Sequence, residues 1–104
     1  MIQLITNTNS AIQSPHYELG SIQDVVDYCS AAQVLGVDTE TEGFDFTCKK
    51  MIMFQIGDEH QQFVIDTRFI SIEPLRKILE SKKIIKILHN AKFDYKFIKQ
   101  TSNI

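Results

Sequence analysis

Tryptophan is absent from this chain of 104 residues, and cysteine and proline each occur only twice. The two cysteines, Cys29 and Cys48, are too few for a disulfide scaffold and lack the spacing of a metal-binding motif. Long apolar runs are missing too: none approaches the roughly 20 residues of a membrane-spanning helix, and residues 1–6 lack the basic start of a signal peptide. We therefore expect free thiols, no membrane contact and a cytoplasmic location, either in a cell or as a viral protein acting in the host cytoplasm.

The chain also lacks an excess of positive charge. Its formal net charge is −2, whereas a protein that coats nucleic acid presents a strongly basic surface. This argues against a DNA-coating function but leaves a nuclease open, because an acidic site can recruit the cations that meet the phosphates. A hydrophobic content of 43% and a charged content of 23% are ordinary for one globular domain.

Apolar periodicity predicts an α/β domain. Strands are expected at residues 1–5, 16–19, 34–39, 51–56, 62–66 and 84–88, and helices at 22–32, 72–79 and 90–99. Ser21 and Ser71 are expected to cap the first two helices, and residues 57–60 to form a hairpin turn. The strand at 84–88 is almost entirely apolar, as a central parallel strand should be.

Two carboxylates stand where the strand at 34–39 ends. Asp38 and Glu40 are two residues apart, and side chains with that spacing share one face of a strand. Holding two like charges together away from water costs on the order of several kcal/mol unless a cation lies between them. Hard divalent ions such as Mg²⁺ and Mn²⁺ prefer oxygen ligands. The pair therefore predicts a metal site at this strand end.

A second acidic motif follows about fifty residues later. The apolar strand at 84–88 runs through His89 and Asn90 into a predicted helix that carries Asp94 in its first turn. If the strands at 34–39 and 84–88 are adjacent and parallel, their carboxyl ends open on one crevice, which is where open α/β sheets bind ligands. We expect Asp94 to join Asp38 and Glu40 there, and His89 to be a strand-end residue rather than a ligand.

These two stretches, in this order, resemble the motifs of the DEDD superfamily of 3′→5′ exonucleases. That group includes RNase D and the proofreading domain of polymerase I-type (family A) DNA polymerases. Asp38-Thr39-Glu40 matches the first motif, Asp-x-Glu at a strand end, and Asn90 followed four residues later by Asp94 matches the second. The resemblance covers roughly residues 16–100 and looks closer to the polymerase branch. Asp-x-Glu alone would carry little information, whereas the two motifs together are specific.

The resemblance implies a ribonuclease H-like mixed sheet with flanking helices and a two-metal site for Mg²⁺ or Mn²⁺. Asp38 would bridge both ions, Glu40 would hold the ion that generates hydroxide, and Asp94 would support the second ion. Such a site hydrolyses phosphodiesters at the 3′ end of a nucleic acid. The alternative is that the three acids are ordinary turn residues, which the joint match to both motifs disfavours.

The same resemblance places three further residues against the substrate. The backbone around Thr39 would approach the 3′ end, Phe44 would wedge against the terminal base, and Asn90 would contact a phosphate. Phe44 could instead pack on the core, and Asn90 could serve only as a helix N-cap.

A basic stripe is predicted on the last helix. Lys92, Lys96 and Lys99 are spaced four and three residues apart, so they share one helix face. The stripe is either an ordinary solvated face or a contact for the phosphate backbone. Lys92 and Lys96 are the candidates for that nucleic-acid contact.

The family's third motif, Tyr-x-x-x-Asp or His-x-x-x-x-Asp, does not occur after Asp94. The resemblance therefore implies the front part of an exonuclease domain, with a lead-in at residues 1–15 and a ribonuclease H-like core at 16–104, truncated before the last strand and helices. We expect an incomplete site and an exposed apolar edge at 84–88, which a second chain or a second copy of this chain would cover.

Three functions are consistent with these patterns. The leading hypothesis is a 3′→5′ exonuclease module acting on single-stranded DNA, the front half of a proofreading domain, whose isolated chain is inactive if the missing motif is required. The first alternative is a catalytically inactive nucleic-acid-binding or assembly module of the same fold, which would bind its partner even after Asp38→Asn. The second is an RNase D-like exoribonuclease, to be separated with RNA and DNA substrates of one sequence.

Overall fold

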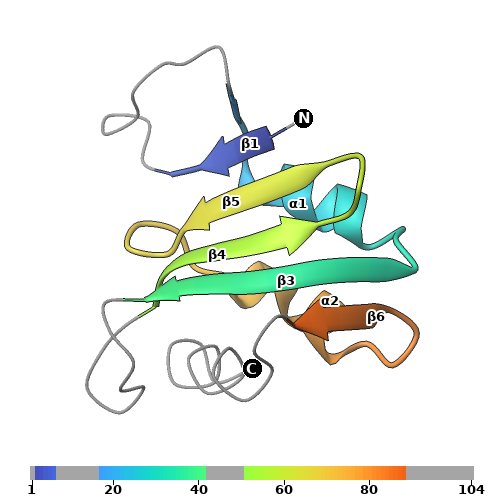
Figure 1. The fold of residues 1–104 in the computed structure, drawn as a ribbon. Helices are drawn as coiled ribbons and strands as arrows, with labels where there is room; N and C mark the ends of the chain where they lie inside the picture. The colour runs from blue at the N-terminus through green and yellow to red at the C-terminus, as the bar shows by residue number, and fades with distance from the viewer. Residues whose placement is uncertain (1, 7–16, 42–50, 89–104) are drawn as a thin grey trace.

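The fold is a single six-stranded sheet with helices on one face (Figure 1). The computed structural model describes residues 2–6, 17–41 and 51–88. The strands are β1 (Ile2–Ile5), β2 (Glu18–Leu19), β3 (Val34–Thr41), β4 (Met51–Gly57), β5 (Gln62–Asp66) and β6 (Ile85–Leu88). The helical elements are α1 (Ile22–Cys29), the 3₁₀-helix η2 (Glu73–Leu75) and α2 (Arg76–Glu80). Among the described residues, no helix is long and apolar enough to cross a membrane.

The strand order is β2-β1-β5-β4-β3-β6, and only β4 runs against its neighbours. The pairs β1–β2, β1–β5 and β3–β6 are all parallel, so β1, β5, β3 and β6 share one direction. The predicted adjacency of the strands at 34–39 and 84–88 is confirmed, since Val37 lies opposite Leu88. This mixed sheet with its helices confirms the predicted ribonuclease H-like α/β class.

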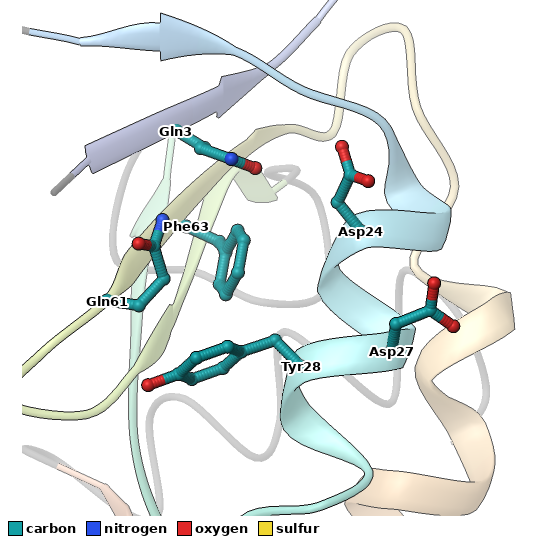
Figure 2. A pocket seen from close by; sticks show the side chains of 6 residues that line it. All are labelled: Gln3, Asp24, Asp27, Tyr28, Gln61 and Phe63. Carbon is teal, nitrogen blue, oxygen red and sulfur yellow. The ribbon is translucent and has the colours of Figure 1, made fainter.

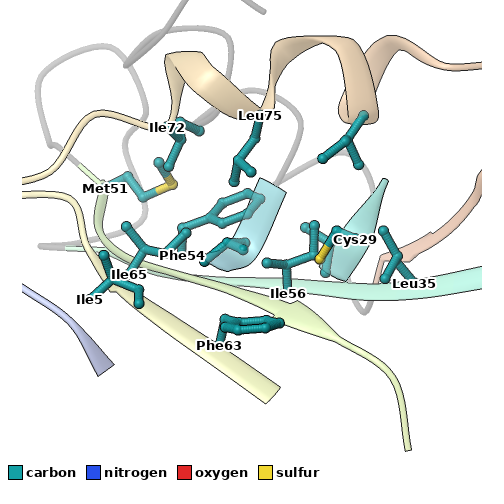
Figure 3. Close-up of a cluster of buried hydrophobic side chains, with 13 residues drawn as sticks. Ile5, Cys29, Leu35, Met51, Phe54, Ile56, Phe63, Ile65, Ile72 and Leu75 are labelled. Atoms are coloured by element: carbon teal, nitrogen blue, oxygen red, sulfur yellow. The ribbon is translucent and has the colours of Figure 1, made fainter. Parts of the chain in front are cut away.

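The hydrophobic core fills the space between the sheet and the helices. Alternate residues of each strand face the helices, because side chains on a strand point to opposite faces in turn. Phe54 and Ile56 of β4 and Leu75 of η2 are completely buried there. Figure 3 shows this core, which includes Ile5, Cys29, Leu35, Met51, Phe54, Ile56, Phe63, Ile65, Ile72 and Leu75.

The hairpin between β4 and β5 is held by one carboxylate. Asp58 accepts hydrogen bonds from the backbone N–H groups of His60 and Gln61, each at 2.9 Å, and from the Tyr28 hydroxyl at 2.8 and 2.9 Å. Gly57 precedes it, and a side chain there would collide with the backbone oxygen of Gln61. The hydrogen bond from Tyr28 is the main reason that the pKa of Asp58 lies below its ordinary value. The turn and α1 are thereby fixed to each other.

Several predicted boundaries differ from the structure. β3, the strand that carries Asp38 and Glu40, extends to Thr41, although it was predicted to end at residue 39. The second helix begins at Glu73 rather than at residue 72, as a 3₁₀ turn that leads into the short α2. Ile72 takes the N-cap position, although Ser71 accepts a hydrogen bond from the Glu73 N–H at 3.1 Å, as a capping serine does. Pro74 lies in that turn. A proline cannot donate a backbone hydrogen bond, which favours such a broken start.

The N-terminal strand has a larger role than its sequence predicts. β1 lies inside residues 1–15, which were expected to form a lead-in, yet it pairs with β5 over four residues and also with β2. Ile5 at its end is 1% exposed. The sheet therefore includes part of the segment that was predicted to precede it.

Candidate functional site

β3 divides its side chains between the two faces of the sheet. Leu35, Val37 and Thr39 are buried on the face that the helices cover. Asp38 and Glu40 lie on the other face, the uncovered face, over which none of the described helices lies. Asp38 is partly exposed there, and Glu40 is exposed. The predicted sharing of one face by the two carboxylates follows from this alternation. Both carboxylates lie near the end of β3, where the strand becomes accessible to solvent.

The pairing of β3 with β4 changes at this point. Asp38 lies opposite Gln55 and Glu40 lies opposite Met53, but the register shifts between Glu40 and Thr41. A β-bulge of this kind bends the strand and changes the direction of the neighbouring side chain. Such irregularities are common beside functional sites, and this one directly follows the acidic pair.

A hollow of about 310 Å³ opens beside Asp38 on the uncovered face of the sheet. Its lining comes from four strands and consists of Gly36, Val37, Asp38, Gln55, Gln62 and Ile87. Gly36 leaves room because a Cβ there would meet nothing closer than the Gly57 oxygen at 3.8 Å. The hollow is polar on the Asp38 side and apolar at Ile87, which is 61% exposed.

A larger hollow of about 430 Å³ lies on the covered face, between α1 and the strands β1 and β5 (Figure 2). Two of its lining atoms, Gln3 Oε1 and Gln61 Nε2, are buried without a hydrogen-bond partner among the described residues. Asp24 and Asp27 of α1 also line it. It lies on the opposite side of the sheet from Asp38 and is therefore separate from the acidic site.

The acidic pair has no cationic partner in the described part of the chain. Asp38 Oδ1 accepts a hydrogen bond from the Thr39 N–H at 2.9 Å, and neither Asp38 nor Glu40 forms an ion pair with a described residue. By contrast, Asp66 and Glu73 are each paired with an arginine. Two unpaired carboxylates on one face suit a hard divalent cation. Within residues 2–6, 17–41 and 51–88 no third metal-ligand side chain joins a cluster.

The remaining predicted site residues fall in two groups. Thr39 is described: the residue is 8% exposed and its side chain lies on the covered face, on the other side of the sheet from Asp38 and Glu40. The approach of its backbone to a substrate stays a prediction. The others lie outside the described residues, and their roles stay predictions. They are Phe44, Asn90, Lys92, Lys96 and Asp94.

The backbone supports one part of the Asp94 prediction. β6 ends at Leu88, which lies opposite Val37, the residue before Asp38. The chain therefore leaves β6 beside the acidic end of β3, six residues before Asp94. The meeting of Asp94 with Asp38 and Glu40 remains to be tested.

The sequence did not predict the uncharged side chains that line the hollow beside Asp38. Gln55 interrupts the apolar run of β4, and that interruption was a usable signal of a polar position on the uncovered face. Gln62 and Ile87 carried no such signal, since their nearness to Asp38 depends on strand order rather than on local pattern. The register is what places Gln55 next to Asp38.

An α/β domain of ribonuclease H-like fold, with two carboxylates at the end of β3 that have no ion-pair partner among the described residues, fits the predicted class of metal-dependent nucleases. A family model described as 3′-5′ exonuclease matches residues 18–104. The chain belongs to this 3′-5′ exonuclease family, as its two acidic motifs predict.

Individual relatives agree with this family. DNA polymerase I of Aquifex aeolicus is 43% identical over 65 residues, which are 62% of this chain and 10% of that protein. Escherichia coli RNase D superposes with a TM-score of 0.71 at 20% identity, covering 95% of this chain and 24% of that one. Brucella melitensis NrnC with bound Mg²⁺ gives a TM-score of 0.67 at 20% identity, covering 97% and 44%. The chain thus spans a tenth to less than half of the length of these proteins.

Proposed function

We propose that this chain is a divalent-metal-dependent 3′→5′ exonuclease module that acts on the 3′ end of DNA, as the front part of a proofreading domain. The observation that carries the proposal is the position of Asp38 and Glu40. Both lie on the uncovered face at the end of β3, beside a hollow, and neither has a cationic partner among the described residues. Membership of the 3′-5′ exonuclease family supplies the reaction class.

Mg²⁺ or Mn²⁺ fits the donor set of this site. Asp38 and Glu40 would hold the metal, with Asp94 as the proposed third ligand. When bound, such ions supply an activated water and neutralise the charge that develops on the phosphate. The Thr39 N–H restrains the Asp38 carboxylate through the 2.9 Å hydrogen bond, so one metal ligand is oriented before any ion binds. A similar fold, NrnC, has been seen with bound Mg²⁺, which supports the choice of ion.

DNA is the proposed substrate rather than RNA. The sequence match of 43% identity is to a DNA polymerase, whereas the match to RNase D is a similarity of fold at 20% identity. A single-stranded DNA and an RNA of the same sequence, assayed side by side, decide between the two, and faster trimming of the RNA would favour the exoribonuclease.

The test uses a 5′-fluorescent single-stranded DNA with Mg²⁺ or Mn²⁺, and the product ladder is followed from the 3′ end. We expect Asp38→Asn and Glu40→Gln each to lower the rate by ~10² or more, as loss of a directly placed catalytic group does. Asp27→Asn is the matched control, because Asp27 is an exposed acid of α1. Its rate should equal that of the parent chain.

The assay needs two conditions, because residues after Asp94 contain no Tyr-x-x-x-Asp. It is run with this chain alone and with an added polypeptide that carries the rest of a polymerase I-type exonuclease domain. Absence of 3′ release in both conditions would contradict the proposal. Binding of Mn²⁺, measured by electron paramagnetic resonance, gives an independent readout and should weaken in Asp38→Asn. Oligonucleotide binding without cleavage would instead favour the assembly module.

We also propose that a further polypeptide covers the β6 side of the sheet. β6 pairs with β3, and among the described residues no strand lies on its other side. Ile85 and Ile87 are each 61% exposed, and Val34 beside them is 44% exposed. An edge strand with exposed apolar side chains is a template for pairing with another chain. The occupant is a second copy of this chain or a partner that completes the site.

A further inference from the structure

An ion pair between a buried aspartate and an exposed arginine lies at the end of β5. Asp66 is 6% exposed, and its carboxylate accepts hydrogen bonds from Arg68 Nε and Nη2, both at 2.9 Å, and from Thr6 Oγ1 at 2.9 Å. The Arg68 N–H adds a fourth bond at 3.2 Å. The bond from the Arg68 side chain is the main reason that the pKa of Asp66 lies below its ordinary value. The charge of the Asp66 carboxylate is therefore paired with Arg68, and its two oxygens accept four hydrogen bonds.

The register places Asp66 on the same face of the sheet as the acidic pair. Met53 of β4 lies opposite Glu40 on one side and opposite Asp66 on the other. Directly opposed residues point to the same face of a sheet, so Asp66 and Glu40 share the uncovered face. With two strand spacings between them, β5 and β3 are about 10 Å apart.

Both residues also lie at the same end of their strands. β3 and β5 run in one direction because each is antiparallel to β4. In Figure 1 the turn that follows β5 leaves from the end of the sheet at which the β3 arrow ends. Arg68 lies in that turn, and its side chain is 60% exposed although Asp66 holds it.

The exposed part of Arg68 is equipped to bind a phosphate. A guanidinium carries five N–H donors, and Asp66 uses only those on Nε and Nη2. Nη1 has no hydrogen-bond partner in the described structure. Because the Asp66 bonds fix the guanidinium plane, less side-chain freedom is lost when a phosphate binds.

Phe69 provides an aromatic surface next to this guanidinium. Its side chain is among the exposed large hydrophobic groups, at 50%, and Arg68 Cζ lies 5.5 Å from the ring centroid. The ion pair explains why Asp66 is buried, but it does not explain an exposed phenylalanine. Proteins that bind single-stranded nucleic acid combine such groups: the arginine contacts a phosphate, and a base stacks on the aromatic ring.

We propose that Arg68 and Phe69 form a subsite for an upstream nucleotide of the single-stranded substrate whose 3′ end lies at Asp38 and Glu40. The inference rests on the proposed exonuclease function. Glu40 and Asp66 are about 10 Å apart across the sheet, whereas the single internucleotide phosphate of a dinucleotide would lie at the metal site. A phosphate at Arg68 therefore belongs to a nucleotide farther upstream. The subsite therefore contacts longer oligonucleotides and is out of reach of a dinucleotide.

The test measures binding of 5′-fluorescein-labelled (dT)8 and (dT)2 by anisotropy, in Ca²⁺, over a series of KCl concentrations. Arg68→Ala should weaken (dT)8 binding by about tenfold and reduce the slope of log Kd against log salt by about 0.7, the value for one lost phosphate contact on a single strand. Phe69→Ala should weaken it by roughly 5- to 100-fold with an unchanged slope. Binding of (dT)2 should change with neither variant.

Arg76→Ala is the matched control. Arg76 is the other arginine of the chain and is also ion-paired, with Glu73 at 2.5 Å and Glu80 at 3.1 Å, but it belongs to α2 on the covered face. Its (dT)8 affinity and salt slope should match the parent chain.

Folding is checked by circular dichroism, since Arg68→Ala leaves Asp66 without its main partner. If that variant does not fold, Phe69→Ala decides, because it leaves the ion pair intact. Folded variants that bind (dT)8 within twofold of the parent chain would overturn the subsite. Asp38→Asn separates this result from the proposed function: it should abolish cleavage and leave the Arg68-dependent part of the salt slope in place.

Discussion

Asp38 and Asp66 are the same side chain on the same face of one sheet, yet their neighbours give them different chemistry. Asp66 is buried, its charge is paired with Arg68, and its oxygens accept hydrogen bonds from Arg68 and Thr6, so it has no capacity left for a metal. Asp38 accepts one backbone hydrogen bond, and it has no charged partner in the described part of the chain. The partner, rather than the residue type, separates a structural carboxylate from a candidate ligand.

The sequence predicted the position of Asp38 and Glu40 better than it predicted the ion pair of Asp66. The placement of Asp38 and Glu40 on one face followed from a spacing of two residues in a strand. The pairing of Asp66 with Arg68 was not anticipated, because it needs a turn that brings residues 66 and 68 together. Gln55 was missed for a related reason: cross-strand neighbours depend on register, which local sequence does not specify.

Cys29 allows a prediction at the scale of one side chain. It is completely buried, and burial raises the pKa of its thiol to about 11. Above its ordinary pKa of ~8.5 the unfolded chain loses the proton while the folded chain keeps it. The free energy of unfolding should therefore fall as the pH rises from about 8.5 to about 11.

Urea titrations at about pH 8 and about pH 10 measure this effect. Cys29→Ala should show a smaller loss of stability between the two pH values, because other groups titrate equally in both proteins. In a Cys48→Ser background, the Cys29 thiol should react with a disulfide reagent far more slowly than it does in urea. An equal pH dependence in the Cys29→Ala variant would contradict the assignment.

At the scale of secondary-structure elements, the sequence predicted the features that depend on neighbouring residues, namely a helix cap and a hairpin turn. Ser21 caps α1 as expected: its hydroxyl accepts from the Asp24 N–H at 3.3 Å, and the Asp24 carboxylate accepts from the Ser21 N–H at 2.9 Å. The β4–β5 hairpin was also predicted, because Gly57 and Asp58 form its turn. β1 was recognised as a strand, but its partner was not, since β5 lies about sixty residues away in sequence.

The α1 cap gives a testable change in stability. Ser21→Ala removes the hydroxyl that accepts from Asp24, which should cost about 1 kcal/mol of folding free energy. Ser21→Gly is the matched comparison, since glycine at an N-cap costs only a few tenths of a kcal/mol. Chemical denaturation of both variants measures the difference. Equal losses in the two variants would show that the capping box contributes little here.

At the scale of the whole molecule, the sheet is unevenly protected. The helices cover one face, while the β3–β6 side exposes Val34, Ile85 and Ile87. The expected exposed edge at residues 84–88 is therefore present in alternate positions only: Ile85 and Ile87 are exposed, whereas Ile84 and Leu88 pack against the core.

This exposure predicts association. At micromolar concentration the chain should sediment as a concentration-dependent mixture rather than as a monomer. Ile85→Lys should shift the distribution toward monomer, because lysine on an edge strand opposes further pairing. Ile85 is the chosen position, since it does not line the hollow beside Asp38. A monodisperse monomer with ordinary stability would count against the proposed partner.

The common direction of β1, β5, β3 and β6 has one more consequence. All four strands release the chain at a single rim, at Ile5, Asp66, Thr41 and Leu88. If the proposed function is correct, we expect substitutions beyond those points to change substrate choice more than they change the pairing of the strands. The strands themselves would then set the stability of the sheet, and the segments at this rim would set what it binds.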